Sequence, residues 1–504
     1  LLDEMSHSLA HRGSDAKSVW NDGVIGLGHR MLWTTPESVG EQLPKSIYGD
    51  NFVITADARI DNREDLVREL ALSRNALDEV ISDSELIVRS YEKWGEDCTS
   101  HLVGDFAFAI WDKRNHSVFC ARDHFGVKPL YYYQSPRFFV FGTEIRALLC
   151  VPQVPRVLNE LKVGDFLSGY DEDDSDTFYK NVYRLPARSQ MTVTQSENWI
   201  ETYWSLDPKR ELRLSSDGEY AENLRELFTE AVRCRMRSAY PIASMLSGGL
   251  DSSSIACTAG KLMAKNATLR SNVQRKLHTF SAVFEEVTKS DESDYIDAVL
   301  ESGDYHPHFL KADQVSPMAD WEKIIGQQDE AIPGSNLYIC QYFYGKAQSL
   351  GVRVVLDGFD GDTTISHGSR YFLELAQAKQ WRLLIKNIRG YAKNFDESAL
   401  ALAWAFYWRF GLEPKLPAHR LTSPLRRLGR NINVRLRERS KYSRTKFTDF
   451  TSELNPDFVE QIKLADRQIS LAESRPSSPK TEREDHHSKL SSKTIPSTLE
   501  MQNK

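Results

Sequence analysis

The apolar positions follow two different rhythms along the chain. Up to residue 150, stretches of β-branched and aromatic residues alternate with polar ones, separated by turn residues. This alternation predicts half-buried β-strands. They lie at 24–32, 52–60, 106–112, 116–123, 129–135 and 138–145. A helical rhythm is confined to 61–95 and to the start of the chain. Strands this dense favour stacked antiparallel sheets with a few covering helices.

From residue 218 the pattern changes to strands that alternate with helices. An amphipathic helix at 218–237 precedes a buried strand at 240–246, and the alternation continues to a strand at 352–356. Near-continuous apolar strands separated by helices are typical of a parallel α/β sheet. The two rhythms predict the following parts: a first domain at 1–150, a connecting region at 151–215, a second domain at 216–470, and at 471–504 a polar tail or the start of a truncated segment.

Composition agrees with a two-domain enzyme of the cytoplasm. The 504 residues exceed what one hydrophobic core normally holds. The net charge of −7 argues neither for nor against an anionic partner, and we expect no nucleic acid. Six scattered cysteines indicate neither a zinc site nor a disulfide framework. Since no signal peptide and no long apolar run is present, we expect no membrane association.

Two charged runs admit more than one interpretation. Ten basic residues lie between 420 and 446 in a region that looks helical. They form either a solvated helix face or an electrostatic surface for a peptide or a partner protein. The acidic run between 171 and 176 is interpreted as a solvated loop.

The strongest chemical signal is the string Ser-Gly-Gly-Leu-Asp-Ser-Ser at 247–253, between a buried strand and a helix. Glycines let backbone amides approach a phosphate, serine hydroxyls add donors, and the helix N-terminus favours an anion. Asp251 is a suitable ligand for Mg²⁺. The string is not a Walker A motif, because no Gly-Lys-Ser/Thr follows. We therefore predict an ATP pyrophosphatase loop.

A second arm of the site is expected at the end of another strand. The strand 352–356 is followed by Asp357, Gly358, Phe359, Asp360, Gly361 and Asp362. Ligands of open α/β sheets bind at the carboxyl ends of the strands, so these carboxylates are candidates for a metal-binding arm.

These motifs resemble the asparagine synthetase B family over nearly the whole chain. The loop at 247–253 is similar to the family's pyrophosphatase loop, and 356–362 occupies the place of its second nucleotide loop. The segment 102–133 is close to the signature of its amidotransferase domain. The resemblance implies an N-terminal glutamine amidotransferase-like domain of the N-terminal-nucleophile αββα type. It implies a C-terminal parallel α/β ATP pyrophosphatase domain, of the adenine nucleotide alpha hydrolase type.

The resemblance also implies site residues. Leu246 and Ala282 would lie against adenosine, and Asp357 and Gly358 would contact the nucleotide. Asp251 and Asp362 would ligate Mg²⁺ as the catalytic carboxylates. Pyrophosphate would be held by Ser247, Gly248, Gly249, Asp251 and Ser252.

The glutamine pocket departs from the family's pattern. Asp57 stands where the family has an asparagine that donates to the oxyanion, and a carboxylate there repels developing negative charge. Arg59, after Ala58, replaces the glutamate that holds the substrate's amino group, and Met31 replaces an arginine that grips its carboxylate. Of these positions only Asp83 keeps the family's residue. The chain has no N-terminal cysteine nucleophile, which we attribute to missing N-terminal residues. We interpret this domain as a retained scaffold; hydrolysis of another substrate is the alternative.

An adenylating domain without an ammonia supply needs another amine. The strings at 26–38, 54–66 and 356–368 look like the lasso peptide cyclases of the family. That branch adenylates an Asp or Glu side chain of a precursor peptide, which the peptide's own amine then attacks, and a leader-peptide protease is an expected partner. The alternatives are a glutamine-hydrolysing asparagine synthase that acts on aspartate, and a relic that binds ATP or a peptide. The C-terminal segment that supplies a catalytic lysine in the family has no convincing match here.

Overall fold

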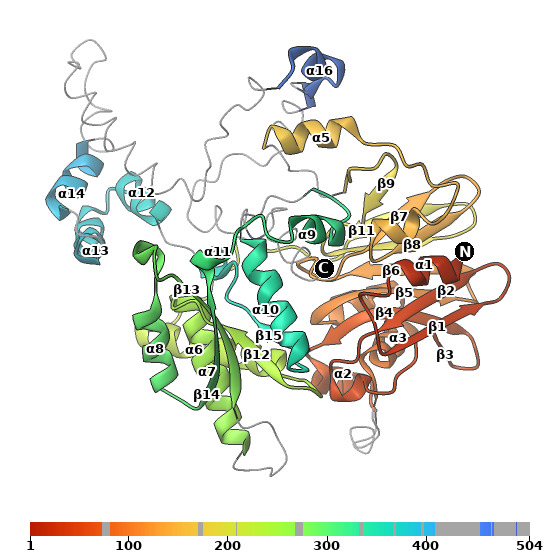
Figure 1. Cartoon of the computed structure of the whole chain (residues 1–504), viewed down its shortest axis with the longest axis horizontal. Coiled ribbons are helices and arrows are strands. Elements are labelled where there is room, and N and C mark those ends of the chain that lie inside the picture. Colours follow the sequence, from red (N-terminus) through yellow and green to blue (C-terminus); the bar gives the residue numbers. More distant parts are fainter. Residues whose placement is uncertain are drawn as a thin grey trace.

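A computed structural model shows two domains, joined by a region that runs alongside the first (Figure 1). It describes residues 1–72, 81–169, 175–207, 209–267, 276–331, 336–365, 369–394, 398–408, 454–464, 466–467 and 490.

The N-terminal domain contains two layers of β-sheet. One layer is a six-stranded antiparallel sheet in the order β11-β10-β6-β5-β4-β3. The other consists of the pair β1-β2 and the three strands β8-β7-β9. The strands are β1 (Ala16–Asn21), β2 (Gly26–Met31), β3 (Lys45–Ile47), β4 (Phe52–Ile60), β5 (Gly104–Asp112), β6 (Ser117–Arg122), β7 (Tyr131–Gln134), β8 (Phe139–Gly142), β9 (Val182–Arg184), β10 (Ser189–Val193) and β11 (Asn198–Thr202).

Alternate side chains of the long strands fill the spaces on both faces of the six-stranded sheet. Phe106 and Phe108 point to the side covered by α2 (Arg63–Glu69) and α3 (Asp83–Trp94). Their neighbours Ala107 and Ala109 pack with Leu27 of β2 in the space between the two sheets. Beyond the second layer lie α1 (Leu2–Ser8) and α4 (Ile145–Leu148), whose apolar residues contact β7 and β9. The order helix, sheet, sheet, helix confirms the predicted αββα domain.

The predicted boundary at residue 150 is wrong. β9, β10 and β11 belong to the supposed connecting region 151–215, yet they complete the N-terminal sheets. Met191 and Val193 of β10 are buried against Val118 and Cys120 of β6. The sequence showed only a weak strand pattern here because these strands are short and one of them, β11, is exposed throughout. The first domain therefore extends past Thr202.

The C-terminal domain is built on a parallel sheet in the order β14-β13-β12-β15. Its strands are β12 (Ile242–Met245), β13 (Leu277–Val283), β14 (Tyr305–Lys311) and β15 (Val354–Leu356). The helix α10 (Leu337–Ser349) packs on one face through Phe343 and Ala347. The helices α6 (Asp217–Arg235), α7 (Leu250–Ala267) and α8 (Ser293–Glu301) pack on the other. The parallel α/β prediction is confirmed.

The chain reverses direction across this sheet between β12 and β15. From β12 it proceeds outward to β13 and β14, and then returns to place β15 on the other side of β12. Such a switch point leaves a crevice at the carboxyl ends of β12 and β15, where ligands of open α/β sheets bind.

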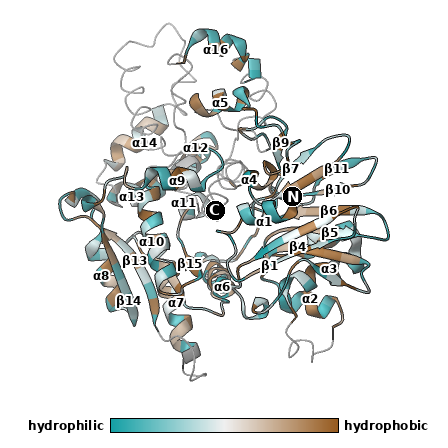
Figure 2. Cartoon of the chain, turned by 45° about the vertical axis from the view of Figure 1, so that its right-hand side comes forward, coloured by the Kyte–Doolittle hydropathy of each residue, from teal (hydrophilic) through white to brown (hydrophobic). Residues whose placement is uncertain are grey.

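The remaining helices lie beyond the sheet. α9 (Trp321–Gln327) precedes α10, and α11 (Gly361–Ile365) follows β15. A separate helical core joins α12 (Ser369–Gln377), α13 (Trp381–Asn394) and α14 (Ala399–Tyr407), and α14 carries hydrophobic residues along its length (Figure 2). The basic stretch at 420–446 and the acidic residues 171–174 lie outside the described residues, as does most of 471–504.

Part of the connecting region contacts the end of the described chain. α5 (Glu160–Leu167) lies beside α16 (Pro456–Gln461) in Figure 1. Arg467 donates to Asp165 at 2.8 Å and to Asp176 at 3.0 Å, so the last residue of the predicted acidic run is ion-paired. No helix in the described part of the chain is long and apolar enough to cross a membrane.

The corrected boundary gives a testable prediction. A fragment that ends at residue 150 lacks β9, β10 and β11, which leaves Val118 and Cys120 of β6 exposed. We expect this fragment to aggregate, while a fragment ending at residue 206 folds. Circular dichroism and gel filtration of both fragments provide the measurement; a monomeric, folded 1–150 fragment would contradict the boundary.

Candidate functional site

The turn between β12 and α7 is braced by its own serine hydroxyls. The Ser247 amide donates to Oγ of Ser252 at 3.1 Å, and the two hydroxyl oxygens lie 3.0 Å apart. The amide of Gly249 donates to Oγ of Ser247 at 3.3 Å. The turn therefore has a fixed shape and ends at the N-terminus of an 18-residue helix, where the helix dipole favours an anion.

Gly248 must be glycine in this turn. Its φ angle is +92°, a left-handed conformation that side chains rarely adopt. A Cβ atom at Gly248 would also lie 2.9 Å from Cβ of Glu292, which precedes α8. Both constraints preserve the close approach of the loop backbone that a phosphate site needs.

The loop after β15, predicted as the second part of the site, lies directly against the turn between β12 and α7. A Cβ atom at Gly358 would be 2.7 Å from the amide nitrogen of Ser252, and one at Gly361 would overlap the carboxylate of Asp251. Asp357 accepts a hydrogen bond from the amide of Phe359 at 3.0 Å, and burial raises the pKa of its carboxyl. The ends of β12 and β15 thus form one continuous surface.

The other predicted nucleotide residues fall around this surface. Leu246 is buried and its amide donates to the carbonyl oxygen of Phe280 at 2.8 Å, while Ala282 near the end of β13 packs on the side of α10. The side chain of Asp362 lies outside the described part of the structure. Oγ of Ser253 and Oδ2 of Asp360 are buried without a hydrogen-bond partner among the described residues. Such polar atoms at the strand ends suit a polar ligand.

A metal would be held here by few protein ligands. Among the described residues, no group of three or more His, Cys, Asp or Glu side chains is placed to hold a metal ion. A site with one or two carboxylates is consistent with Mg²⁺, which takes its remaining ligands from phosphates and water. The position of Asp251 against Gly361 fits that donor set.

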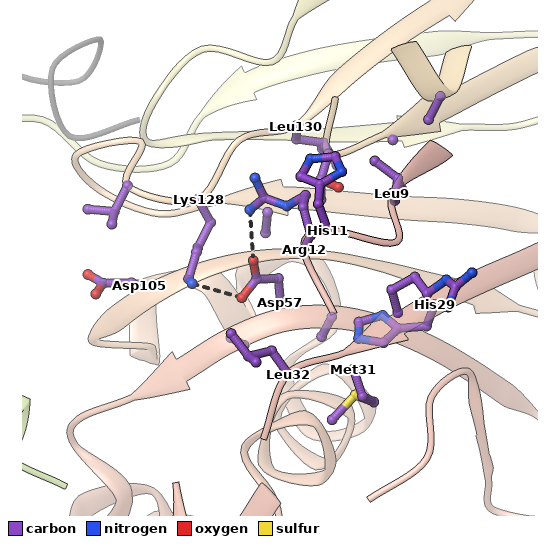
Figure 3. A pocket seen from close by; sticks show the side chains of 18 of the residues that line it. Leu9, His11, Arg12, His29, Met31, Leu32, Asp57, Asp105, Lys128 and Leu130 are labelled. Carbon is purple, nitrogen blue, oxygen red and sulfur yellow. Dashed lines mark ion pairs between the residues drawn. The ribbon is translucent and has the colours of Figure 1, made fainter. Parts of the chain in front are cut away.

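In the N-terminal domain, Asp57 is held between two cations. Nζ of Lys128 lies 2.8 Å from one carboxylate oxygen, and the Arg12 guanidinium lies 3.5 Å from the other (Figure 3). Burial opposes ionisation, but Lys128 and Arg12 hold the pKa of Asp57 at about 2. Asp57 is therefore an anion at neutral pH. Met31, buried at 6% exposure, presents no charge to this pocket.

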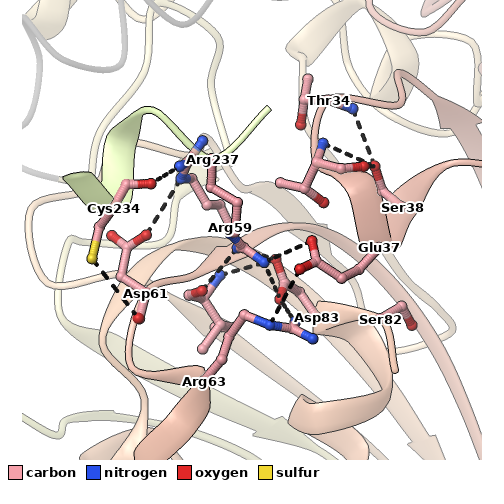
Figure 4. Close-up of polar contacts among 12 residues, drawn as sticks. Thr34, Glu37, Ser38, Arg59, Asp61, Arg63, Ser82, Asp83, Cys234 and Arg237 are labelled. Carbon is pink, nitrogen blue, oxygen red and sulfur yellow. Dashed lines mark hydrogen bonds and ion pairs between the residues drawn. The ribbon is translucent and has the colours of Figure 1, made fainter. Parts of the chain in front are cut away.

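The carboxylate of Asp83 also accepts hydrogen bonds from several groups of the protein. It accepts hydrogen bonds from Arg63 of α2 and from Arg237, and the contact from Nη2 of Arg237 to Oδ2 measures 2.8 Å (Figure 4). The backbone amide of Ile60 adds a third donor at 3.2 Å. Asp83 is thus bound by two guanidinium groups and one backbone amide of the protein itself.

Arg59 turns toward the other domain. It donates to the carbonyl oxygen of Cys234 at the end of α6, and Nε lies 3.3 Å from Asp61 (Figure 4). Ala58 is adjacent to it on β4, opposite Phe106 of β5. The predicted pocket positions are therefore together in space, but their charges are used in contacts within the protein.

Sequence reasoning missed the cations of this region. Arg12, Lys128, Arg63 and Arg237 had no signal of their own, because they lie far from their partners along the chain. A buried carboxylate needs a compensating partner, so cations were to be expected near Asp57 and Asp83. The sequence alone does not show which cations these are.

One cavity of about 3000 Å³ extends from the predicted pocket positions of the N-terminal domain to Asp357 in the loop after β15. Asp57, Arg59 and Asp83 line it on the N-terminal side. Tyr338, Gln341, Tyr344, Asp357 and Phe359 line it on the C-terminal side. Pockets for small ligands usually measure about 300–1,000 Å³, so this cavity has room for a larger molecule.

The titration of His29 in the pocket gives a testable prediction. Burial lowers its pKa to about 4, although the charge of Asp57 acts against this. An unfolded chain binds that proton below about pH 6.5, so the free energy of unfolding should fall as the pH drops from 6.5 toward 4. We expect His29 to contribute a loss of about 2 kcal/mol between pH 7 and pH 5.

Urea unfolding at both pH values measures this loss. His29→Gln removes the titration and should make the stability less dependent on pH, while the exposed control His7→Gln should behave like the wild type. An unchanged pH dependence in His29→Gln would contradict the assignment.

Comparison with known proteins matches both domains. Residues 1–204 match the family model described as a glutamine amidotransferase domain, and residues 223–494 match the one described as asparagine synthase. Among curated proteins, asparagine synthetase [glutamine-hydrolyzing] 3 of Bacillus subtilis is 32% identical over 57% of this chain and 46% of its own length. Putative asparagine synthetase [glutamine-hydrolyzing] 2 of Methanocaldococcus jannaschii is 30% identical over 72% of this chain and 71% of its own length.

A relative with a different description also matches. Amidase chyE of Penicillium rubens is 27% identical over 72% of this chain and 54% of its own length. The matched part spans about half the length of the Bacillus subtilis and Penicillium rubens proteins.

Proposed function

Because this chain belongs to the asparagine synthase family, we propose that it forms an amide bond at the expense of ATP. In this proposal a side-chain carboxylate of Asp or Glu attacks ATP and pyrophosphate leaves. An amine then attacks the activated carbonyl carbon and AMP leaves. The observation that carries the proposal is the contact between the loops 247–252 and 357–361 at the switch point of the parallel sheet.

The residues of these loops have distinct tasks. The braced turn of Ser247, Gly248, Gly249 and Ser252 would bind pyrophosphate through backbone amides and hydroxyls, at the positive end of α7. Leu246 and Ala282 would contact adenosine from the strand ends, and Asp357 and Gly358 would border it on the other side. Mg²⁺ bound by Asp251 and Asp362 would neutralise charge on the departing pyrophosphate.

The state of the amidotransferase-like pocket supports an amine other than ammonia from glutamine. Asp57 is anionic where an oxyanion would have to be stabilised. Asp83 is bound by Arg63 and Arg237, so a substrate ammonium would have to displace a buried guanidinium. The nitrogen would then arrive on the substrate itself.

A substrate that carries both groups is a peptide with an acidic side chain and a free amine. The cavity of about 3000 Å³ between the two domains has room for such a chain. We therefore favour a macrolactam cyclase of the lasso peptide type, acting on a small precursor peptide with a leader-peptide protease as partner.

A glutamine-hydrolysing asparagine synthase is the second candidate. The relatives named asparagine synthetases favour it, as does the continuity of the cavity from Asp57 to Asp357. Aspartate would then be the substrate. A relic that binds ATP or a peptide without turnover is the third.

Pyrophosphate release separates the three candidates. The protein is incubated with ATP and Mg²⁺, and with either aspartate and glutamine or a peptide that bears an acidic side chain and a free amine. We expect release and loss of water from the peptide by mass spectrometry, and no glutamate from glutamine. Asparagine formed together with glutamate would overturn the cyclase proposal, and nucleotide binding without release under any condition would support the relic.

The close contact at Gly361 gives a sharper test of the metal assignment. Gly361→Ala places a methyl group 2.8 Å from Cβ of Asp251 and closer still to its carboxylate, so the side chain of Asp251 must shift. We expect the affinity for Mg²⁺-ATP to fall about tenfold or more.

Gly390→Ala in α13 is the matched control, because nothing lies within 4 Å of the added methyl group. It should bind Mg²⁺-ATP like the wild type. Equal affinities for both variants, measured by isothermal titration calorimetry, would show that Asp251 does not hold the metal.

A further inference from the structure

The two strands that lead into the nucleotide loops are each preceded by an arginine that reaches into the N-terminal domain. Arg237 lies five residues before β12, and Arg353 comes directly before β15. Both side chains are mostly buried, with exposures of 19% and 23%. Their partners are acids and backbone carbonyl oxygens of the amidotransferase-like domain.

Arg237 is bound by three acceptor groups of the N-terminal domain. It donates to Asp83, to Oε2 of Glu37 at 3.0 Å and to the carbonyl oxygen of Ile60 at 2.8 Å. Two of these acceptors come from the β4–α3 side of the degenerate pocket and one from the turn after β2 (Figure 4). A guanidinium held at this many points has its position fixed in three dimensions.

Arg353 is held in the same manner. It makes a two-point contact with Asp15, in which Nη2 lies 2.9 Å from Oδ1, and donates to the carbonyl oxygen of Trp33 at 2.7 Å. Its guanidinium also lies over the ring of Tyr240, 3.8 Å from the centroid. Tyr240 is part of the segment that follows Arg237. Its stacking with Arg353 therefore links Arg237 and Arg353, which are called the two anchors below.

The path from each anchor to the nucleotide surface is short. β12 has four residues and β15 has three, and the two strands pair in parallel from Ile242–Val354 to Ser244–Leu356. At about 3.3 Å per residue, the strands themselves span about 10–13 Å, and residues 238–241 lie between Arg237 and the start of β12. A shift at Arg353 would reach Asp357 along β15 alone, whereas a shift at Arg237 would reach Ser247 through residues 238–241 and β12.

We propose that the amidotransferase-like domain serves as a mount that positions the two nucleotide loops through Arg237 and Arg353. On this view, Asp83 of the former glutamine pocket binds an internal guanidinium and thereby sets the location of β12. The proposal accounts for the presence of a pocket whose charges are turned inward. It rests on the proposed function for the identity of the ligand, but its structural part stands on the contacts alone.

Simple adhesion between the domains is the competing explanation. The domains also meet at Asp329 and Glu330, which pair with Arg146 and Arg184. Arg146 resembles the two anchors, since Nε lies 2.7 Å from Asp329 and Nη2 donates to the carbonyl oxygens of Gly326 and Gln327. It contacts the end of α9 and Asp329 just beyond it, and neither β12 nor β15. A variant of Arg146 therefore weakens the domain contact without touching the mount.

The test compares Arg237→Met, Arg353→Met and Arg146→Met in the full chain by hydrogen–deuterium exchange of the free protein. We expect amides at 242–252 and 354–361 to exchange about tenfold faster in the first two variants and at wild-type rates in Arg146→Met. Unchanged exchange in Arg237→Met and Arg353→Met would overturn the proposal. Equal acceleration in Arg146→Met would overturn it as well, in favour of adhesion.

Nucleotide affinity provides the second measurement. The dissociation constant for Mg²⁺-ATP should rise about fivefold in Arg237→Met and Arg353→Met and stay within about twofold in Arg146→Met. Arg237→Lys keeps the charge beside Asp83 and should recover part of the affinity. Wild-type affinity for Mg²⁺-ATP in both Arg237→Met and Arg237→Lys would contradict the positioning role.

The two measurements separate the inference from the proposed function. If the wild type does not bind Mg²⁺-ATP, the proposed function fails, and the exchange rates still decide whether the mount exists. If the wild type binds ATP and the exchange of 242–252 is insensitive to Arg237, the mount fails while the proposed function stands.

Discussion

Asp83 lies where two domains meet, and its carboxylate can remain buried there only because a guanidinium from each domain compensates it. Arg63 comes from the N-terminal domain and Arg237 from the C-terminal one. Transferring a carboxylate from water to a protein interior costs several kcal/mol unless it is paired and hydrogen-bonded. Asp83 therefore couples the arrangement of the two domains to the charge balance of the pocket that contains it.

The same constraint explains the rest of the pocket. Asp57 is ionised because Lys128 and Arg12 lie beside it, and Arg59 donates to the carbonyl oxygen of Cys234. These pairs are satisfied without any ligand. A pocket that binds glutamine needs the opposite condition, in which polar groups remain available for the substrate.

In the loops after β12 and β15, backbone geometry is more important than charge. Gly248, Gly358 and Gly361 are placed where a side chain would collide with Glu292, Ser252 or Asp251. Only a surface of bare backbone lets two loops and a phosphate approach one another this closely. The switch point of the sheet brings the loops together, and the short strands β12 and β15 join them to the anchors at Arg237 and Arg353.

Much of this could be determined from the sequence because it depends on local order. The change of apolar periodicity near 218 identifies the parallel sheet, and the string at 247–253 locates the turn between β12 and α7, since periodicity and turn residues act over a few positions. The altered identities at Met31, Asp57 and Arg59 were equally visible. Only the tertiary structure decided that β9, β10 and β11 complete the first domain, because strand pairing is a long-range choice that the short exposed β11 does not reveal. It also decided which cations compensate the buried acids, since Arg12 and Asp57, or Asp83 and Arg237, become neighbours only when the fold closes the distance along the chain.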